Sequence, residues 1–305
     1  MSRIHEALKK AEQERAMSQG GHVEAAPVAT VSPADPVVMN PGSGIPAVQT
    51  PSFTAQFTFD TLLARCAQRE WHPDAKTMLF FGAQDNVRGM EEFRTLRSRL
   101  YHLREKAPLK KLLVTSSLPK EGKTFVAANL AQVLAKQHGR RVLLIDGDLR
   151  GPKLHEALGT PSTPGLSDYL LGESDEFAIM LRGPMENLFF VPAGRQVSSP
   201  AELVANGRLK FLLSRVESQF DWIVLDSPPA VPVSDASLLA TFCDGVLMVV
   251  RSNVTPFDMA RKARQEFRDQ QLVGVVLNGI DHNASAYSRY YYGYEDKNVA
   301  SNGKG

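Results

Sequence analysis

The chain has 305 residues, 43% of them apolar, which is enough to bury a core in one large domain with tails or in two small domains. Its 35 basic and 33 acidic residues nearly cancel, so bulk charge gives no support for a nucleic-acid-binding or membrane-surface protein. Cys66 and Cys243 lack the spacing of a metal site, which favours unreactive thiols in a reducing cytosol over a disulfide. The longest apolar run, residues 246–250, is far shorter than the roughly 20 residues of a membrane helix. We therefore expect a cytoplasmic protein that binds no nucleic acid and does not itself insert into a membrane.

Two segments precede the expected domain. Residues 1–16 are predicted to form a short helix, capped by Ser2, with Ile4, Leu8 and Ala11 at helical spacing. Its apolar stripe is thin, so a docking element and a solvated tail remain equally open. Residues 17–56 are rich in proline and alanine and carry few charges, a composition typical of a disordered linker.

Residues 60–281 are predicted to form one α/β domain. After a helix over residues 87–104, short apolar runs alternate with helical patterns, which indicates parallel strands joined by helices that cover both faces of a doubly wound, mostly parallel sheet. In such sheets ligands bind at the carboxyl ends of the strands. The strand-like runs span residues 110–116, 141–146, 187–194, 222–229, 245–252 and 272–279, and helices are expected from Lys123, Ala201, Asp235 and Pro256.

A phosphate-binding motif follows the first run. Residues 117–124, SLPKEGKT, fit the pattern G-x4-G-K-[ST] except that Ser117 replaces the first glycine. Gly122 would let the backbone approach phosphates, Lys123 would neutralise them and Thr124 would bind Mg²⁺. The alternative is a strand-to-helix turn that matches by accident. The predicted nucleotide-binding residues are Ser117, Pro119, Lys120, Glu121, Gly122, Lys123, Thr124 and Phe125.

Carboxylates follow two further strand-like runs. Asp146 ends the run RVLLID, and Asp148 follows two residues later. If the chain stays extended, both carboxylates project from the same side of it. Asp226 ends WIVLD, where a carboxylate can hold Mg²⁺ or its water. Asp146 and Asp148 could instead cap the next helix or pair with Arg150, and a single acid after an apolar strand, such as Asp226, is common. Together with Lys123 they predict one magnesium-nucleotide pocket.

The segments SSLPKEGKT, LLIDGDLR and IVLDSPP, together with the tyrosine-rich AYSRYYYGYEDK, resemble the bacterial tyrosine kinases of polysaccharide-export systems, which have a P-loop NTPase fold. The resemblance spans roughly residues 80–294. EEFRTLR is similar to that family's E-x-x-R-x-x-R segment, which lies between neighbouring subunits of a ring and corresponds here to Glu91, Arg94 and Arg97. The N-terminal segment resembles variants found beside exopolysaccharide gene clusters.

The resemblance implies ATP and Mg²⁺ as cofactors and a role for each matched residue. Lys123 would grip the phosphates, and Thr124, Asp146 and Asp226 would arrange Mg²⁺ directly or through water. Asp148 would activate the incoming tyrosine hydroxyl, and Lys123, Asp146 and Asp148 are the expected catalytic residues. Asn278 is expected to contact adenine, although it fits a strand end equally well. Arg150 would orient the acidic pair or meet phosphate.

Residues 282–305 are predicted to be a flexible tail, and the resemblance explains its crowded tyrosines as phosphorylation sites used in trans within a ring-shaped homo-oligomer. Each phosphate would add about −1.5 to −2 charges, so the accumulating charge would expel the tails and loosen the ring. The family also implies a membrane chain-length-determinant protein that activates the kinase and recruits it to the inner membrane, where it would regulate exopolysaccharide polymerisation and export. The expected phosphorylation sites are Tyr287, Tyr290, Tyr291, Tyr292 and Tyr294.

Two other functions remain open. A positioning or partitioning ATPase of the same fold would carry a K-G-G-x-G-K-[ST] loop, but Leu118 stands where its first lysine belongs. A nucleotide-binding regulatory scaffold without catalysis is disfavoured because the lysine, the threonine and the three aspartates are all present. Incubation with ATP and Mg²⁺ distinguishes the three by yielding tail phosphotyrosine, free phosphate alone, or neither.

Overall fold

The computed structural model describes residues 57–81, 89–267 and 272–280, all of them within the unit Thr54–Gly305. The predictions for residues 1–16, for the linker 17–56 and for the tyrosine-rich tail 282–305 lie outside the described residues. Within the described ranges, no helix has both the length and the apolar character needed to cross a membrane.

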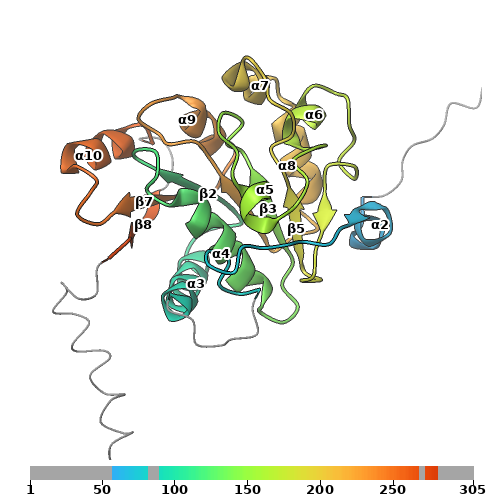
Figure 1. The fold of residues 1–305 in the computed structure, drawn as a ribbon, viewed down its shortest axis with the longest axis horizontal. Helices are drawn as coiled ribbons and strands as arrows, with labels where there is room; N and C mark the ends of the chain where they lie inside the picture. The colour runs from blue at the N-terminus through green and yellow to red at the C-terminus, as the bar shows by residue number, and fades with distance from the viewer. Residues whose placement is uncertain (1–56, 82–88, 268–271, 281–305) are drawn as a thin grey trace, which may run out of the picture. The chain divides into compact units, whose positions relative to one another are not determined.

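One sheet of eight strands forms the centre of the described residues (Figure 1). Its strand order is β1-β4-β5-β3-β6-β2-β7-β8, and every neighbouring pair is parallel except β4 and β5. The predicted fold class, a mostly parallel doubly wound sheet, is confirmed. The strands are β1 (Ala67–Gln68), β2 (Lys111–Ser116), β3 (Val142–Asp146), β4 (Leu181–Arg182), β5 (Leu188–Val191), β6 (Trp222–Asp226), β7 (Gly245–Arg251) and β8 (Leu272–Asn278).

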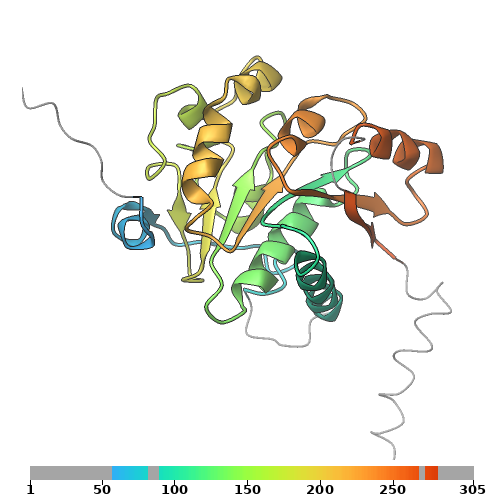
Figure 2. The ribbon, with the colours of Figure 1, turned by 180° about the vertical axis from the view of Figure 1, so that it is seen from behind.

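Helices cover both faces of this sheet (Figures 1 and 2). Alternate side chains of the central strands enter two apolar clusters, because successive residues of a strand point to opposite faces. Residues of α3, α4 and α5 join one cluster, and residues of α2 and α6 to α10 join the other. The helices are α2 (Phe59–Arg65), α3 (Met90–Arg104), α4 (Lys123–Ala135), α5 (Leu154–Leu158), α6 (Leu166–Leu170), α7 (Pro200–Ala205), α8 (Arg208–Val216), α9 (Asp235–Ala240) and α10 (Phe257–Gln265).

The helix that begins the site, α4, is buried over almost its whole length, with Val126 to Ala135 all buried. Two amide side chains on it hold a segment of turns against its surface. The Asn129 side chain accepts a hydrogen bond from the Leu79 amide at 2.8 Å and donates to the Thr77 carbonyl at 2.8 Å. The Gln132 side chain accepts one from the Phe80 amide at 3.2 Å. Residues 77–80 therefore form a strap that is hydrogen-bonded to α4.

The structure differs from the predicted elements in two places. The helix predicted from Ala201 is two helices, α7 and α8, because Gly207 between them adopts a left-handed conformation with φ of +83°. The short elements α2, α5, α6, β1 and β4 were not predicted. The helices have five to seven residues and the two strands have two residues each, which is too short for a periodic apolar pattern.

Both cysteines are free thiols. Burial raises the pKa of the Cys66 thiol to about 12 and also raises the pKa of Cys243. These thiols are therefore protonated and unreactive at neutral pH, in line with the sequence.

Candidate functional site

The predicted lysine and carboxylates meet at the carboxyl ends of three adjacent strands, β3, β6 and β2. Asp146 and Asp226 stand opposite each other in the register of β3 and β6. The phosphate loop, residues 117–124, connects β2 directly to α4, whose first residue is Lys123. The sheet order thus brings together side chains that are about a hundred residues apart in the sequence.

Gly122 is required at the end of the phosphate loop for two reasons. Its φ of +95° lies in the left-handed region, which a residue with a side chain rarely adopts. A Cβ atom at this position would also stand 2.1 Å from the Asn278 side-chain nitrogen. The glycine lets the loop turn into α4, so that the first amides of the helix face the place where anions bind.

Lys123 lies at the centre of the polar cluster. Its Nζ donates to Asp148 Oδ2 at 2.8 Å, lies 3.2 Å from Thr124 Oγ1 and stands 3.8 Å from Asp226 Oδ2. Thr124 Oγ1 donates in turn to Asp226 Oδ2 at 2.6 Å. The ammonium and the hydroxyl that would serve a nucleotide are therefore held by carboxylates.

The two carboxylates of the β3 end are fixed by backbone amides. Asp146 accepts hydrogen bonds from the amides of Asp148 at 3.2 Å and Leu154 at 3.3 Å. Asp148 Oδ1 accepts one from the Gly151 amide at 3.0 Å. Between them, Gly147 allows close packing, since a Cβ there would stand 2.7 Å from the Asp226 carbonyl oxygen. This packing aims Asp148 at Lys123.

Three carboxylates face one ammonium in this cluster, and the pKa values reflect the excess of negative charge. Burial, followed by the charges of Asp226 and Asp148, raises the pKa of Asp146 well above its usual value. Burial also raises the pKa of Asp226, despite the opposing effects of Lys123 and Thr124. Burial alone would lower the pKa of Lys123, but Asp226 and Asp148 outweigh it and raise that pKa. The cluster therefore suits an additional cation.

Oxygen atoms suited to Mg²⁺ are present in this cluster. Asp226 Oδ1 is buried and has no hydrogen-bond partner within the described residues, while Oδ2 contacts the Thr124 hydroxyl. The described ranges contain no group of three or more His, Cys, Asp or Glu side chains arranged to hold a metal alone. Mg²⁺ commonly binds through one or two carboxylates plus substrate phosphates, so this donor set fits a magnesium ion that arrives with a nucleotide.

Three side chains from the β7 and β8 end brace the phosphate loop, one of them through the loop residue Glu121. Glu121 is buried, and its carboxylate accepts a hydrogen bond from the Leu118 amide at 3.0 Å and another from the Thr255 hydroxyl. The Asn278 side chain donates to the Glu121 carbonyl at 2.9 Å, and Arg251 donates to the Lys120 carbonyl at 3.2 Å. Thr255 and Arg251 were not predicted, because they are far from the loop in the sequence and only folding brings them into contact with it.

The remaining predicted nucleotide-binding residues differ in burial. Ser117 is buried, and its Oγ has no hydrogen-bond partner within the described part of the chain. Pro119 and Lys120 are exposed at the tip of the loop, whereas Phe125 is half-buried and packs edge-on against Phe93 at 5.7 Å between ring centroids. All four belong to the phosphate loop or directly follow it in the sequence.

Arg150 contacts neither Asp146 nor Asp148 directly. Its guanidinium forms two hydrogen bonds with Asp235, at 2.8 and 2.9 Å, and the Asp235 side chain is almost fully buried. Asp235 is the first residue of α9. The pair thus ties the loop that follows β3 to the segment that follows β6, a role that the sequence did not reveal.

The predicted interface residues lie on α3. They line a groove of about 870 Å³ between α3 and strands β7 and β8, together with Val275. Glu91 and Arg94 form an ion pair at 2.9 Å, and Arg97 donates to the Val133 carbonyl of α4 at 3.1 Å. The site at the strand ends therefore does not include these residues.

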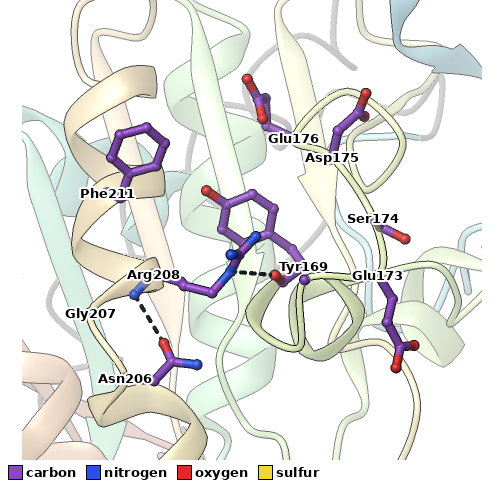
Figure 3. A pocket seen from close by; sticks show the side chains of 10 residues that line it. Tyr169, Glu173, Ser174, Asp175, Glu176, Asn206, Gly207, Arg208 and Phe211 are labelled. Atoms are coloured by element: carbon purple, nitrogen blue, oxygen red, sulfur yellow. Dashed lines mark hydrogen bonds between the residues drawn. The ribbon is translucent and has the colours of Figure 1, made fainter. Parts of the chain in front are cut away.

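A second cavity, of about 520 Å³, lies between α6 and α8 (Figure 3). Tyr169 and Phe211 border it, and the Arg208 guanidinium stacks near the Tyr169 ring, 5.1 Å from its centroid. The carboxylates on its rim pair with arginines, as Glu176 does with Arg215 at 2.7 Å. This cavity offers no free lysine and carboxylate set, so it does not compete with the strand ends as a phosphate site.

Comparison with known proteins gives consistent results. A family model described as an AAA domain matches residues 120–259. The chain is 35% identical over 209 residues to the tyrosine-protein kinase wzc of Salmonella typhimurium, covering 68% of this chain but only 29% of that protein. It is 34% identical over 209 residues to the tyrosine-protein kinase YwqD of Bacillus subtilis, covering 68% of this chain and 87% of that protein. The chain thus spans less than a third of the longer relative.

Solved structures show the same likeness. The kinase domain of the Escherichia coli tyrosine kinase ETK superposes with a TM-score of 0.62 at 28% identity, covering 65% of this chain and 78% of that chain. The chimerical protein CapA2B2 superposes with a TM-score of 0.63 at 27% identity, covering 72% of this chain and 96% of that chain.

Proposed function

Because the chain belongs to the family of bacterial tyrosine-protein kinases, we propose that it transfers the γ-phosphoryl group of ATP to tyrosine residues in its own C-terminal tail, with one copy of the chain modifying another. The observation that carries the proposal is the convergence of Lys123, Asp148, Asp226 and Thr124 at one end of the sheet. Such a set fits phosphoryl transfer, in which the protein mainly positions the reactants and neutralises charge.

In the proposed reaction, the tyrosine oxygen attacks the γ-phosphorus of ATP, and the bond from that phosphorus to the β-γ bridging oxygen breaks. The phenol proton passes to the Asp148 carboxylate, and ADP leaves. A free tyrosine has a pKa of about 10, so a carboxylate that orients its hydroxyl and accepts its proton is useful. Lys123, which now donates to Asp148, would turn to the β- and γ-phosphates when ATP binds.

Thr124, Asp146 and Asp226 are the proposed magnesium residues. Magnesium, when bound, would offset phosphate charge and the excess of carboxylates described above. The Asn278 side chain donates to the Glu121 carbonyl, and its remaining donor and acceptor are proposed to meet adenine. ATP and Mg²⁺ are therefore the proposed cofactors.

The tail follows β8 closely in sequence. Asn278 touches the phosphate loop, and Tyr287 comes nine residues later. We propose that a ring-shaped homo-oligomer, with Glu91, Arg94 and Arg97 at its subunit contacts, supplies each site with a neighbour's tail at high local concentration. A membrane chain-length-determinant protein is the proposed activator; it would recruit the kinase from the cytoplasm to the inner membrane, where the kinase regulates exopolysaccharide polymerisation and export.

A mixing experiment tests both the activity and its direction. The acceptor chain carries Lys123→Met, and the donor chain carries Phe at the five tail tyrosines, Tyr287, Tyr290, Tyr291, Tyr292 and Tyr294. With ATP and Mg²⁺, we expect mass spectrometry to find phosphotyrosine in residues 282–305 of the acceptor only when the donor is present. Lys106→Met, which changes an exposed lysine in the turn after α3 and outside the phosphate loop, should behave like the wild type.

Two results would contradict the proposal in different ways. Tail phosphotyrosine on purified Lys123→Met incubated alone would remove Lys123 from catalysis. If the wild type by itself modifies its own tail but the acceptor stays unmodified when mixed with the donor, the reaction occurs within one chain.

A further inference from the structure

Glu121 is an unusual residue to find inside a phosphate-binding loop. It directly precedes Gly122, which is followed by Lys123, and only 3% of its surface is exposed. A buried carboxylate beside a phosphate site works against anion binding through charge repulsion. Its presence therefore calls for a structural reason that outweighs this cost.

The contacts of Glu121 supply that reason. Oε2 accepts a hydrogen bond from the Leu118 amide at 3.0 Å, within the loop, and Oε1 accepts one from the Thr255 hydroxyl, outside it. Thr255 Oγ1 is itself held by the Arg251 amide at 2.9 Å. The carboxylate thus links the start of the phosphate loop to the turn between β7 and α10.

The last residues of β7 and β8 also hold the loop where its backbone is strained. Lys120 has a φ of +66°, a conformation that disfavours residues with a side chain and persists only where neighbouring contacts impose it. Arg251 donates to the Lys120 carbonyl at 3.2 Å, and Asn278 donates to the next carbonyl, that of Glu121, at 2.9 Å. Three contacts from the β7 and β8 end therefore act on two successive loop residues.

We propose that Thr255 and Glu121 are positioning residues, which hold the phosphate loop in its phosphate-accepting shape before a nucleotide arrives. Neither side chain needs to touch the nucleotide. Thr255 acts through the Glu121 carboxylate, and Glu121 acts through the Leu118 amide. The inference rests on the proposed nucleotide site, but the shape of the empty loop can be measured independently of it.

The test replaces the Thr255 hydroxyl without changing the volume of the side chain. Thr255→Val removes the donor to Glu121 and the acceptor for the Arg251 amide, whereas Thr255→Ser keeps both. Thr241→Val is the matched control, because the hydroxyl of this exposed threonine bonds only to the Leu238 carbonyl one turn back. Thr255→Ala is a second variant for the case in which the extra valine methyl group prevents folding.

Two measurements are made on the full-length chain. Hydrogen-deuterium exchange of the peptide containing residues 117–124, without nucleotide, reports the order of the loop. The KM for ATP and kcat, measured by tail phosphorylation, report its use. We expect Thr255→Val and Thr255→Ala to exchange faster in this peptide and to raise the KM for ATP about tenfold with kcat nearly unchanged, because each loses a hydrogen bond to a charged group. Thr255→Ser and Thr241→Val should match the wild type.

Unchanged exchange in the loop peptide of Thr255→Val would overturn the inference, and so would an equal rise in KM for Thr255→Ser. A lower melting temperature with normal loop exchange and normal KM would show a merely structural threonine and would also overturn it. If the wild type itself binds no ATP, the proposed nucleotide site fails, and the exchange data still decide whether Thr255 orders the loop.

Discussion

At the tip of β3, Asp146 is fully buried and yet has only two backbone amides and a neighbouring ammonium to offset its charge. Burial and the charges of Asp226 and Asp148 raise its pKa well above the usual value. Between the pKa of the unfolded chain, about 3.9, and the raised value, the folded protein binds more protons than the unfolded one. In the absence of nucleotide and magnesium, Asp146 therefore lowers the free energy of unfolding as the pH rises through this window.

Asp146→Asn should remove this pH-dependent penalty. We expect the free energy of unfolding of the variant, minus that of the wild type, to increase from pH 4.5 to pH 8, measured by urea denaturation with EDTA and without nucleotide. The Asn side chain can accept only one of the two backbone hydrogen bonds that Asp146 accepts, which lowers the free energy of unfolding by the same amount at every pH. The quantity to compare is therefore the slope of the free energy of unfolding against pH. Parallel curves would contradict the assignment. The same variant should lose tail phosphorylation.

Single residues of the site were predictable where they occupy a recognisable position in the local sequence pattern. Lys123, Asp146 and Asp226 each end a strand or begin a helix, and strand ends of a parallel sheet converge by topology. Thr255 gave no signal, because its hydroxyl reaches Glu121 across 134 residues of sequence. The partner of Arg150 was hidden for the same reason: Asp235 reads only as a helix start.

At the scale of elements, the strap formed by residues 77–80 determines how firmly α4 is held. Asn129 is buried in the middle of this helix and satisfies both the Leu79 amide and the Thr77 carbonyl. We expect Asn129→Ala to lower the free energy of unfolding by about 2–4 kcal/mol, since it leaves two backbone groups without partners. Urea denaturation measures the change.

Gln265→Ala is the control for that prediction, because Gln265 is an exposed amide side chain in α10. It should change the free energy of unfolding by less than about 0.5 kcal/mol. If Asn129→Ala changed the free energy of unfolding as little as Gln265→Ala does, the hydrogen bonds between Asn129 and residues 77–80 would not stabilise the fold.

Elements with a long apolar pattern were predicted well, and the rest were not. The central strands are buried on both faces and are flanked by helices, so their apolar runs are continuous. The break between α7 and α8 depends on the left-handed backbone of Gly207, and the sequence alone does not distinguish such a break from a tolerated glycine. The two amides in AANLAQVLA were a visible signal, since buried polar side chains in an apolar helix need partners.

For the whole molecule, the groove beside α3 is where the proposed oligomer can be tested. Arg94 pairs with Glu91 on the helix surface at 2.9 Å. Arg94→Glu would replace that attraction with repulsion and present the wrong charge to a neighbouring copy. We expect a smaller mass in analytical ultracentrifugation and tail phosphorylation at least about tenfold slower in dilute solution, because the local concentration of tails is lost.

Arg261→Glu is the matched control. Arg261 pairs with Asp258 on α10 at the same spacing and the same distance, 2.9 Å. It should leave both mass and phosphorylation unchanged. If Arg94→Glu keeps the wild-type mass, the α3 groove is not a subunit contact, although the chemistry at the strand ends could still stand.

The bracing of the phosphate loop by β7 and β8 sets a boundary for any shortened version of this protein. A fragment that stops after α10 would keep Lys123 and every carboxylate at the strand tips. It would nevertheless lose Asn278, and with it the amide that holds the Glu121 carbonyl beside Gly122. The smallest piece worth expressing for nucleotide studies therefore ends beyond Asn278, however complete its motifs look without it.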